Sequence, residues 1–218
     1  MRPRALDLFC CAGGAGMGLH RAGFDVVGVD IRPQPRYPFE FHQADAISFP
    51  VEGFDFIWAS PPCQAHTSMK SMHNARTHLD LIPATRAKLM ASGLPYVIEN
   101  VVGAPLRDAF TLCGTMFGLG YEDAQLRRHR QFEANFPVLA PKCQHTKGSR
   151  TIGIYGEGCR DSRRKFDKTI PEFTVKQGRI AMDAPWMTIA ELCEAIPPAY
   201  SEFIGRAAMR MIERRIAA

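Results

Sequence analysis

Short apolar runs alternate with longer amphipathic stretches through the first half of the chain. Runs of strand length, with glycine, proline or charged residues at or just after their ends, lie at residues 5–9, 26–30, 54–59 and 96–101. Residues 17–22 and 79–92 have the pattern of helices, and Gly23 is placed to end the first of them. Alternating strands and helices are typical of a mostly parallel sheet with helices on both faces. The pattern therefore predicts an α/β fold in which ligands bind at the carboxyl ends of the strands.

The pattern changes after about residue 136. Residues 137–178 are rich in Gly, Arg, Lys and Thr, and only 151–155 has the pattern of a strand. Helices are expected again at 187–196 and 200–216, separated by a pair of prolines. The expected organisation has three parts, which are a main domain at 1–136, a small loop-rich insert at 137–178 and a C-terminal segment returning to the main domain at 179–218.

The composition is that of an ordinary soluble globular protein. Hydrophobic residues make up 46% of the 218 residues and charged residues 22%, which argues against a disordered chain. No apolar run approaches the roughly 20 residues that a membrane span needs. The seven cysteines are an odd number in a chain without a recognisable secretion signal, so reduced thiols and a cytoplasmic location are expected.

Basic residues gather in three clusters of a chain whose formal net charge is +5. The clusters lie at 127–130, 160–165 and 206–215. Basic clusters favour a polyanionic partner, although a solvated surface is the ordinary alternative. For the last cluster the ordinary alternative is preferred, because cations are favourable at helix C-termini.

A glycine-rich turn follows the first predicted strand. Gly13, Gly14 and Gly16 would let a ligand approach the backbone closely, beside N–H groups at the start of a helix. Asp30 ends the next predicted strand, where an acid can bind ribose hydroxyls. Together these residues predict a nucleoside-type ligand. Asp45 offers an acceptor for an adenine amino group, and an acid in a surface loop is an equally good interpretation.

Cys63 is the residue that most strongly indicates catalysis. It follows Pro61 and Pro62, which stiffen the chain and place the thiol at the ligand edge of the predicted sheet instead of in a core. With a lowered pKa, such a thiol would act as a nucleophile. Glu99 ends another predicted strand, where a partly desolvated carboxyl can hold a proton near neutral pH; a helix cap or an ion-pair partner is the alternative. Buried, unreactive thiols are expected at Cys10, Cys11, Cys113 and Cys193.

Five segments resemble the motifs of the DNA (cytosine-5)-methyltransferase family, in the order of that family. They are Asp7–Gly14, Pro61–Gln64, Glu99–Val101, Arg128–Arg130 and Ala195–Tyr200. The resemblance covers nearly the whole chain except 137–178, which would be a target-recognition insert far shorter than is usual. It implies a Rossmann-like S-adenosylmethionine-dependent methyltransferase fold. Leu126 stands where the family usually has glutamine, and His66 where many members have an aromatic residue.

The resemblance implies methyl transfer from S-adenosylmethionine to C5 of a cytosine that has been rotated out of a DNA duplex, leaving S-adenosylhomocysteine. Cys63 would add to C6 of the ring, which makes C5 carbanion-like, and would be eliminated after C5 loses its proton. Glu99 would hydrogen-bond N3 and Arg130 would contact the O2 side. Arg128 would hold the active-site loop through Glu99 or nearby backbone.

The resemblance also implies two sets of binding residues. The donor site would include Phe9, Gly13, Gly14, Gly16, Asp30, Ile31, Asp45, Ala46, Pro61, Tyr200 and Ser201. DNA contacts are expected from Gln64, Ser68, Arg127, Arg150, Arg163 and Arg164. Cys143, His145 and Cys159 are of zinc-ligand types, but paired Cys-x-x-Cys spacing is missing and no metal is expected. We expect a monomer that acts on double-stranded DNA.

Two alternatives stay open. Part of the family acts on transfer RNA, and the short insert is compatible with that substrate. A nucleic-acid-binding relative without turnover is less favoured, because Cys63, Glu99 and both arginines are retained. The compact form would suit a bacterial or phage-encoded protein, and the residues do not disclose the target sequence.

Overall fold

The computed structural model describes residues 2–66, 79–156 and 158–216 of the chain. Its centre is a seven-stranded sheet in the order β3-β2-β1-β4-β5-β9-β6. The strands are β1 (Arg4–Leu8), β2 (Asp25–Asp30), β3 (Glu40–Gln43), β4 (Phe56–Ala59), β5 (Tyr96–Asn100), β6 (Phe110–Leu112) and β9 (Arg130–Ala134). Neighbours among β1 to β5 run parallel, whereas β9 is antiparallel to both β5 and β6. The predicted, mostly parallel sheet is therefore confirmed, and the four apolar runs form β1, β2, β4 and β5.

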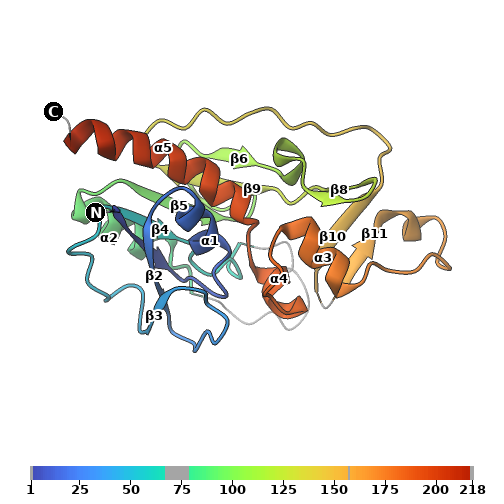
Figure 1. The fold of residues 1–218 in the computed structure, drawn as a ribbon, viewed down its shortest axis with the longest axis horizontal. Helices are drawn as coiled ribbons and strands as arrows, with labels where there is room; N and C mark the ends of the chain where they lie inside the picture. Colours follow the sequence, from blue (N-terminus) through green and yellow to red (C-terminus); the bar gives the residue numbers. More distant parts are fainter. Residues whose placement is uncertain (1, 67–78, 157, 217–218) are drawn as a thin grey trace.

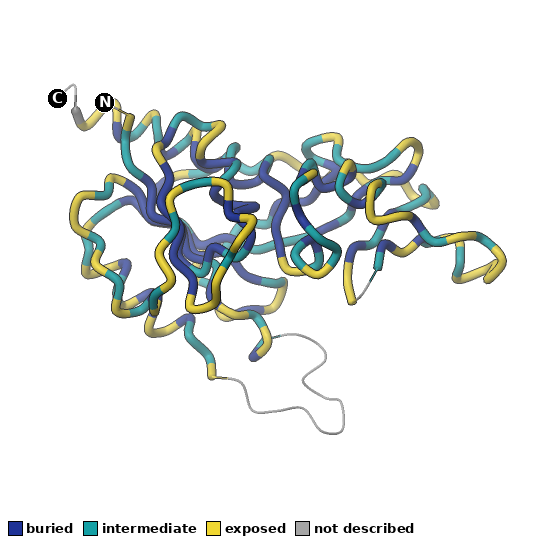
Figure 2. Tube along the Cα trace, turned by 60° about the horizontal axis from the view of Figure 1, so that its bottom comes forward, coloured by how far each residue is buried: buried dark blue, intermediate teal, exposed yellow. Residues whose placement is uncertain are grey.

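Helices cover both faces of this sheet (Figure 1). α1 (Gly14–Arg21) and α5 (Pro198–Ile216) lie on one face, and α2 (Ile82–Ser92) lies on the other. The alternation of side chains along a strand supplies both cores. Ala5 of β1 packs in the cluster with α1 and α5, while Leu6 and Leu8 pack in the cluster with Leu89 of α2. Figure 2 shows these strands as the buried centre of this part of the molecule.

Glycine and proline set several helix boundaries. α1 begins at Gly14, earlier than predicted, because Gly13 adopts a φ of 82° and turns the chain directly into the helix. α2 has a proline in its first turn and ends at Gly93, whose φ is 67°. Pro197 separates α4 (Ile189–Glu194) from α5, which confirms two of the predicted helices. Within the described ranges, no helix is both long and apolar enough to cross a membrane.

A second, four-stranded sheet lies beside the first, in the order β11-β10-β8-β7 (Figure 1). Its strands are β7 (Gly120–Tyr121), β8 (Ala124–Leu126), β10 (Thr151–Tyr155) and β11 (Gly158–Asp161). α3 (Val175–Met182) and α4 pack on it around a core that includes Leu126, Ile154, Phe173, Met182 and Leu192. The core of the small sheet thus contains residues from both sides of the 137–178 interval. The expected insert therefore shares its core with the segments that flank it.

α1 packs directly against the start of α5. A Cβ atom added to Gly18 would lie 2.0 Å from the carbonyl oxygen of Pro198 and 2.1 Å from Oγ of Ser201. Ser201 Oγ donates to the carbonyl oxygen of Ala15 at 2.8 Å, across the same contact. The absence of a side chain at Gly18 therefore lets the two helices touch and brings the C-terminal segment onto the main sheet.

Replacing Gly18 by alanine should lower the free energy of unfolding by about 1–3 kcal/mol or more, because the new methyl group overpacks this contact. Urea denaturation followed by circular dichroism measures the change. Gly158→Ala is the matched control, since the nearest atom to its new Cβ would be 3.7 Å away. An equal loss in both variants would contradict the assignment of Gly18 to helix packing.

Candidate active site

The loop after β4 carries Cys63 and is fixed by hydrogen bonds to two neighbouring strands. The N–H of Ser60 donates to the carbonyl oxygen of Leu8 at 3.1 Å. The side-chain amide of Asn100 donates to the carbonyl oxygen of Pro61 at 2.9 Å. These bonds hold a half-buried Cys63 thiol at the carboxyl end of β4.

Glu99 and Arg130 form an ion pair at the same edge of the sheet. Glu99, near the end of β5, is 7% exposed, and its Oε1 lies 3.2 Å from Nε of Arg130. Arg130 begins β9, and the antiparallel pairing of β9 with β5 places the two side chains together. A buried carboxylate needs such a partner, because an unpaired charge in a core is costly.

The charges of this pair act on the thiol of Cys63. Burial raises the pKa of Cys63, the charge of Glu99 raises it further, and Arg130 and Arg128 oppose the shift. Burial also raises the pKa of Glu99, against the opposing effects of Arg130 and a hydrogen bond with Ser60. The charges of Glu99 and Arg130 thus have opposite effects on the pKa of the thiol. The thiol is mostly protonated at neutral pH, so a nucleophilic role requires that it lose its proton when the substrate binds.

Arg128 has contacts that differ from those expected of it. Its buried guanidinium donates to the carbonyl oxygens of Ile154, at 2.7 Å, and Cys193, at 2.5 Å. Those carbonyls belong to β10 and α4, so Arg128 joins the small sheet to the C-terminal segment instead of holding the loop of Cys63. It is a positioning residue in this structure.

The turn after β1 is held in a strained conformation. Phe9 and Cys11 have positive φ angles of 59° and 45°, which non-glycine residues rarely adopt. The N–H of Cys11 donates to Oδ2 of Asp30 at 3.0 Å, and the indole of Trp186 donates to the carbonyl oxygen of Ala12 at 2.8 Å. Asp30, at the end of β2, therefore fixes the turn as well as offering a carboxylate beside it.

The glycines of this turn are needed for packing. A Cβ atom on Gly14 would lie 2.4 Å from the carbonyl oxygen of Ile196, and one on Gly16 would lie 2.7 Å from the hydroxyl of Tyr37. Tyr37 is buried and donates to Oδ2 of Asp7 at 3.1 Å. The contacts of Gly14 and Gly16 are thus explained by neighbouring protein groups. Tyr37 was not among the predicted residues, because it belongs to no recognisable motif.

The carboxyl ends of β2 and β3 carry two acids and an exposed apolar side chain. Ile31, directly after Asp30, exposes 70% of its surface, which is unusual for a large apolar side chain and suits contact with a base. Asp45 is exposed, and its carboxylate accepts hydrogen bonds from two backbone N–H groups of its own turn. Ala46 and Pro61 are buried at the same edge. An apolar surface next to two carboxylates provides contacts for both a base and a ribose.

Tyr200 and Ser201 do not reach this edge through their hydroxyl groups. Both are fully buried, and the hydroxyl of Tyr200 donates to the carbonyl oxygen of Arg128 at 2.5 Å. Ser201 bonds α1 as described above. Their contacts position α5, which differs from the expected place in a donor pocket.

Two of the arginines expected to contact DNA are engaged within the small sheet. Arg150 pairs with Asp161 at 2.7 Å, and its guanidinium lies 4.5 Å from the ring centroid of Phe173. Arg163 pairs with the same Asp161 at 3.0 Å. Asp161 is buried, so these pairs stabilise the end of β11 and leave neither guanidinium unpaired.

Other basic residues of the small sheet surround a groove with a volume of about 510 Å³. Its lining combines the cations with two acids, and Glu172 pairs with Arg160 at 3.2 Å and with Arg164 at 3.3 Å. The charged residues of the lining are Arg127, Arg160, Arg164, Lys165, Lys168, Asp161 and Glu172. Phe166, next to this lining in the sequence, exposes 92% of its surface. Gln64 is exposed beside Cys63, and Ser68 lies outside the described residues. The groove contains Arg127 and Arg164 of the residues predicted to contact DNA.

Comparisons with known proteins agree with the fold. No protein-family model matches the chain, and no curated protein matches it in sequence. A protein assigned as a DNA modification methyltransferase, encoded within an E. coli prophage, aligns with a TM-score of 0.60 at 14% identity, over 97% of this chain and 99% of that one. The Dnmt2 methyltransferase of S. pombe aligns with a TM-score of 0.58 at 12% identity, over 97% of this chain and 99% of that one. The methyltransferase EhMeth of Entamoeba histolytica aligns with a TM-score of 0.61 at 10% identity, over 97% and 99% of the two chains. The chain therefore has the Rossmann-like α/β fold of these methyltransferases, as predicted.

Replacing Glu99 by glutamine should speed the alkylation of Cys63 by iodoacetamide at neutral pH. Loss of the negative charge lowers the pKa of the thiol, and each unit gives a net gain of about threefold after the lower nucleophilicity of the thiolate is included. Mass spectrometry of the Cys63 peptide measures the rate, with Cys193 in the same digest as the internal standard. An unchanged or slower rate would show that Glu99 does not act on the thiol.

Proposed function

We propose that the protein transfers the methyl group of S-adenosylmethionine to C5 of cytosine in DNA, through a covalent bond between Cys63 and C6 of the ring. The observation that carries this proposal is the meeting of a thiol, a protonatable carboxyl and a guanidinium at one edge of the sheet. Cys63, Glu99 and Arg130 interact there electrostatically, and Arg130 contacts Glu99 directly. Asp30 and the strained turn after β1 lie at the carboxyl ends of the adjacent strands.

Each of these groups has a defined part in the reaction. The thiolate of Cys63 adds to C6, and the electron pair of the C5–C6 double bond moves toward C5 as the new bond forms. Glu99, whose pKa burial raises, donates a proton toward N3 of the ring, while Arg130 contacts the O2 side. S-adenosylmethionine supplies an electrophilic methyl group when it is bound. After C5 has gained the methyl group it loses its proton to water, and the electron pair of that C–H bond re-forms the C5–C6 double bond. Cys63 leaves C6 as a thiolate, and the aromatic ring is restored.

The donor would lie against the residues at the ends of β1 and β2. Asp30 would bind the ribose while its Oδ2 keeps the turn at Cys11 in place. Ile31 would contact the adenine through its exposed apolar surface, and Asp45 would accept from the adenine amino group. Trp186 would keep the turn at its position through its bond to Ala12.

DNA would be bound by the small sheet. Lys165 and Lys168 of its groove suit phosphates, and an exposed aromatic ring such as Phe166 suits contact with bases or sugars. A protein that resembles the chain in fold is assigned as a DNA modification methyltransferase, which supports duplex DNA as the substrate. Contacts of Arg150 and Arg163 with Asp161 assign these two arginines a supporting role.

The chemistry is tested with radiolabelled S-adenosylmethionine and unmethylated duplex DNA. The wild-type protein should place label at C5 of cytosine, and Cys63→Ala should reduce transfer by roughly 10³-fold or more while donor binding is kept. Cys193→Ser, which changes a thiol away from the ligand edge, should transfer at the wild-type rate. Sequencing after chemical conversion maps the methylated positions. Label on transfer RNA alone would replace DNA by RNA in the proposal, and donor binding with transfer to neither would overturn it.

The groove is tested by the salt dependence of DNA binding. Replacing Lys165 and Lys168 together by alanine should lower the slope of log K against log salt concentration by about 1.8, because two phosphate contacts are lost. Arg206→Ala with Arg210→Ala removes the same charge from exposed positions on α5 and should leave the slope unchanged. Equal slopes in the groove variant and the wild type would place DNA elsewhere on the molecule.

A further inference from the structure

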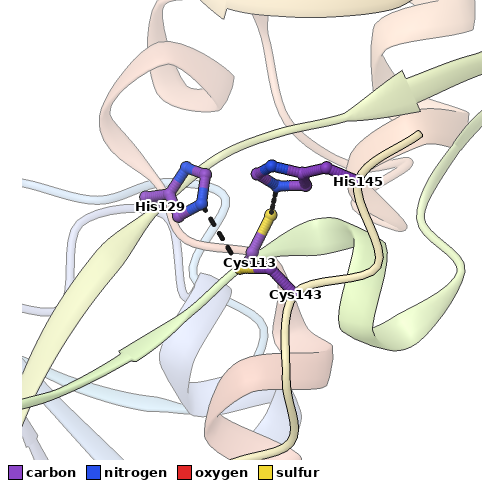
Figure 3. Close-up of side chains that lie close together, drawn as sticks. All are labelled: Cys113, His129, Cys143 and His145. Carbon is purple, nitrogen blue, oxygen red and sulfur yellow. Dashed lines mark hydrogen bonds between the residues drawn. The ribbon is translucent and has the colours of Figure 1, made fainter. Parts of the chain in front are cut away.

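Four side chains of zinc-ligand types meet where the two sheets join (Figure 3). They are Cys113, His129, Cys143 and His145, and their potential ligand atoms all lie within 4.8 Å of one another. Sγ of Cys113 lies 3.1 Å from Nε2 of His145, and Sγ of Cys143 lies 3.5 Å from Nε2 of His129. The close-up shows all four side chains pointing toward one small space.

The pairing of the strands brings these residues together from distant parts of the sequence. Cys113 follows β6, and His129 precedes β9, whose Arg130 is opposite Leu112 in the antiparallel register. Cys143 and His145 come from the long connection between β9 and β10. That connection is held over the cluster by bonds from the N–H of Gln144 to Thr115 and from Arg127 to the carbonyl oxygen of Thr146.

The spacing of the four atoms is close to that of a tetrahedral metal site. Zinc–sulfur bonds of 2.3 Å and zinc–nitrogen bonds of 2.0–2.1 Å place the ligand atoms about 3.3–3.8 Å apart in a tetrahedron. The shortest of the present separations already lie near that range, and the longest is 4.8 Å. Cys143 and His145 are exposed, so their side chains have room to turn toward an ion.

The chemistry of the four donors points to zinc. Two thiolates and two imidazoles suit zinc, whereas magnesium and calcium prefer oxygen ligands. Two separate sulfur–nitrogen hydrogen bonds would explain the Cys113–His145 pair and the Cys143–His129 pair individually. They would not require the rings of His129 and His145 to lie together, yet the centroids of these rings are 4.9 Å apart. A shared central ion accounts for all four positions at once.

We infer that Cys113, His129, Cys143 and His145 bind one structural zinc ion. Four protein ligands fill a tetrahedral site, so the ion would have no open position for a substrate. The inference does not depend on the proposed methyl transfer. It departs from the expectation of no metal, which considered Cys143 and His145 with Cys159. Cys159 lies instead in the core of the small sheet, next to Gly178.

The ion would hold the connection between β9 and β10 onto the crossover between the sheets. His129 stands between Arg128, which bonds the small sheet and α4, and Arg130, which pairs with Glu99. A metal on His129 would therefore restrain the backbone that carries both arginines. Cys113 is fully buried and would be the fixed ligand. The exposed Cys143 and His145 would turn toward the ion to complete its coordination.

The metal content of the purified protein tests this inference directly. Protein expressed with added zinc should contain one zinc ion per chain by plasma mass spectrometry. Cys143→Ser and His145→Ala should each lower the zinc retained after dialysis at least tenfold, because a coordinating side chain is lost. Cys193→Ser and His42→Ala change the same residue types outside the cluster and should keep the full content.

Cobalt provides a second readout that does not rely on a variant. Chelated wild-type protein titrated with Co²⁺ should develop the visible absorption of a tetrahedral ion and a thiolate-to-cobalt charge-transfer band, and Zn²⁺ should bleach both. Chelation should lower the melting temperature, and Zn²⁺ should restore it. Sub-stoichiometric zinc together with no tetrahedral cobalt spectrum would overturn the inference, as would a Cys113–Cys143 disulfide in protein prepared under reducing conditions. Zinc retained in full by both cluster variants would also overturn it.

Discussion

The structure depends on the buried contact between Glu99 and Arg130. It joins β5, the last parallel strand, to β9, which enters the sheet from the opposite direction. Both side chains are largely shielded from water, so removing one partner would leave the other without its counter-charge and would destabilise this edge of the sheet. β9 is reached from the small sheet through residues 127–129, and the loop of Cys63 begins at Ser60, which hydrogen-bonds Glu99. One ion pair thereby fixes the nucleophile loop, the sheet edge and the path into the small sheet.

The sequence predicts those parts of the fold in which local pattern and burial agree. β1, β2, β4 and β5 are buried on both faces, so their apolar runs are continuous and easy to recognise. β6, β7 and β8 are two or three residues long, and their pairing partners are distant in the sequence or lie across a tight turn. A strand of that length has too few residues to display a period. α3 is stabilised by a capping box at Thr174 and Gln177, a local pattern that marks the start of a helix in the sequence itself.

The residues of the candidate site also fall into those that can be placed from the sequence and those that cannot. Residues at the ends of long strands, such as Glu99 and Asp30, can be placed from the sequence because the strand fixes where they lie. Side chains whose role depends on a remote carbonyl group cannot be placed in this way. Arg128 bonds Ile154 and Cys193, and Tyr200 bonds the backbone of Arg128, so both are tied to segments that sequence reasoning could not bring together. The same limit applies to the proposed zinc ligands, because only Cys143 and His145 are close in the sequence and Cys113 and His129 come from two other segments.

The glycine-rich turn after β1 can have two physical causes, which are close packing and the approach of a ligand. Gly14, Gly16 and Gly18 all have neighbours that a Cβ atom would strike, and these neighbours are protein groups of Ile196, of Tyr37 and of the start of α5. The turn can therefore be glycine-rich for packing alone, and the nucleoside interpretation rests on other features, which are Asp30, the exposed Ile31 and the strained φ angles of Phe9 and Cys11. Such strain costs about 1–3 kcal/mol per residue and persists only where the surroundings enforce it. Here Asp30 and Trp186 enforce it through the bonds to Cys11 and Ala12, so the carboxylate that we propose as the ribose ligand also maintains the shape of the turn against which the donor would lie.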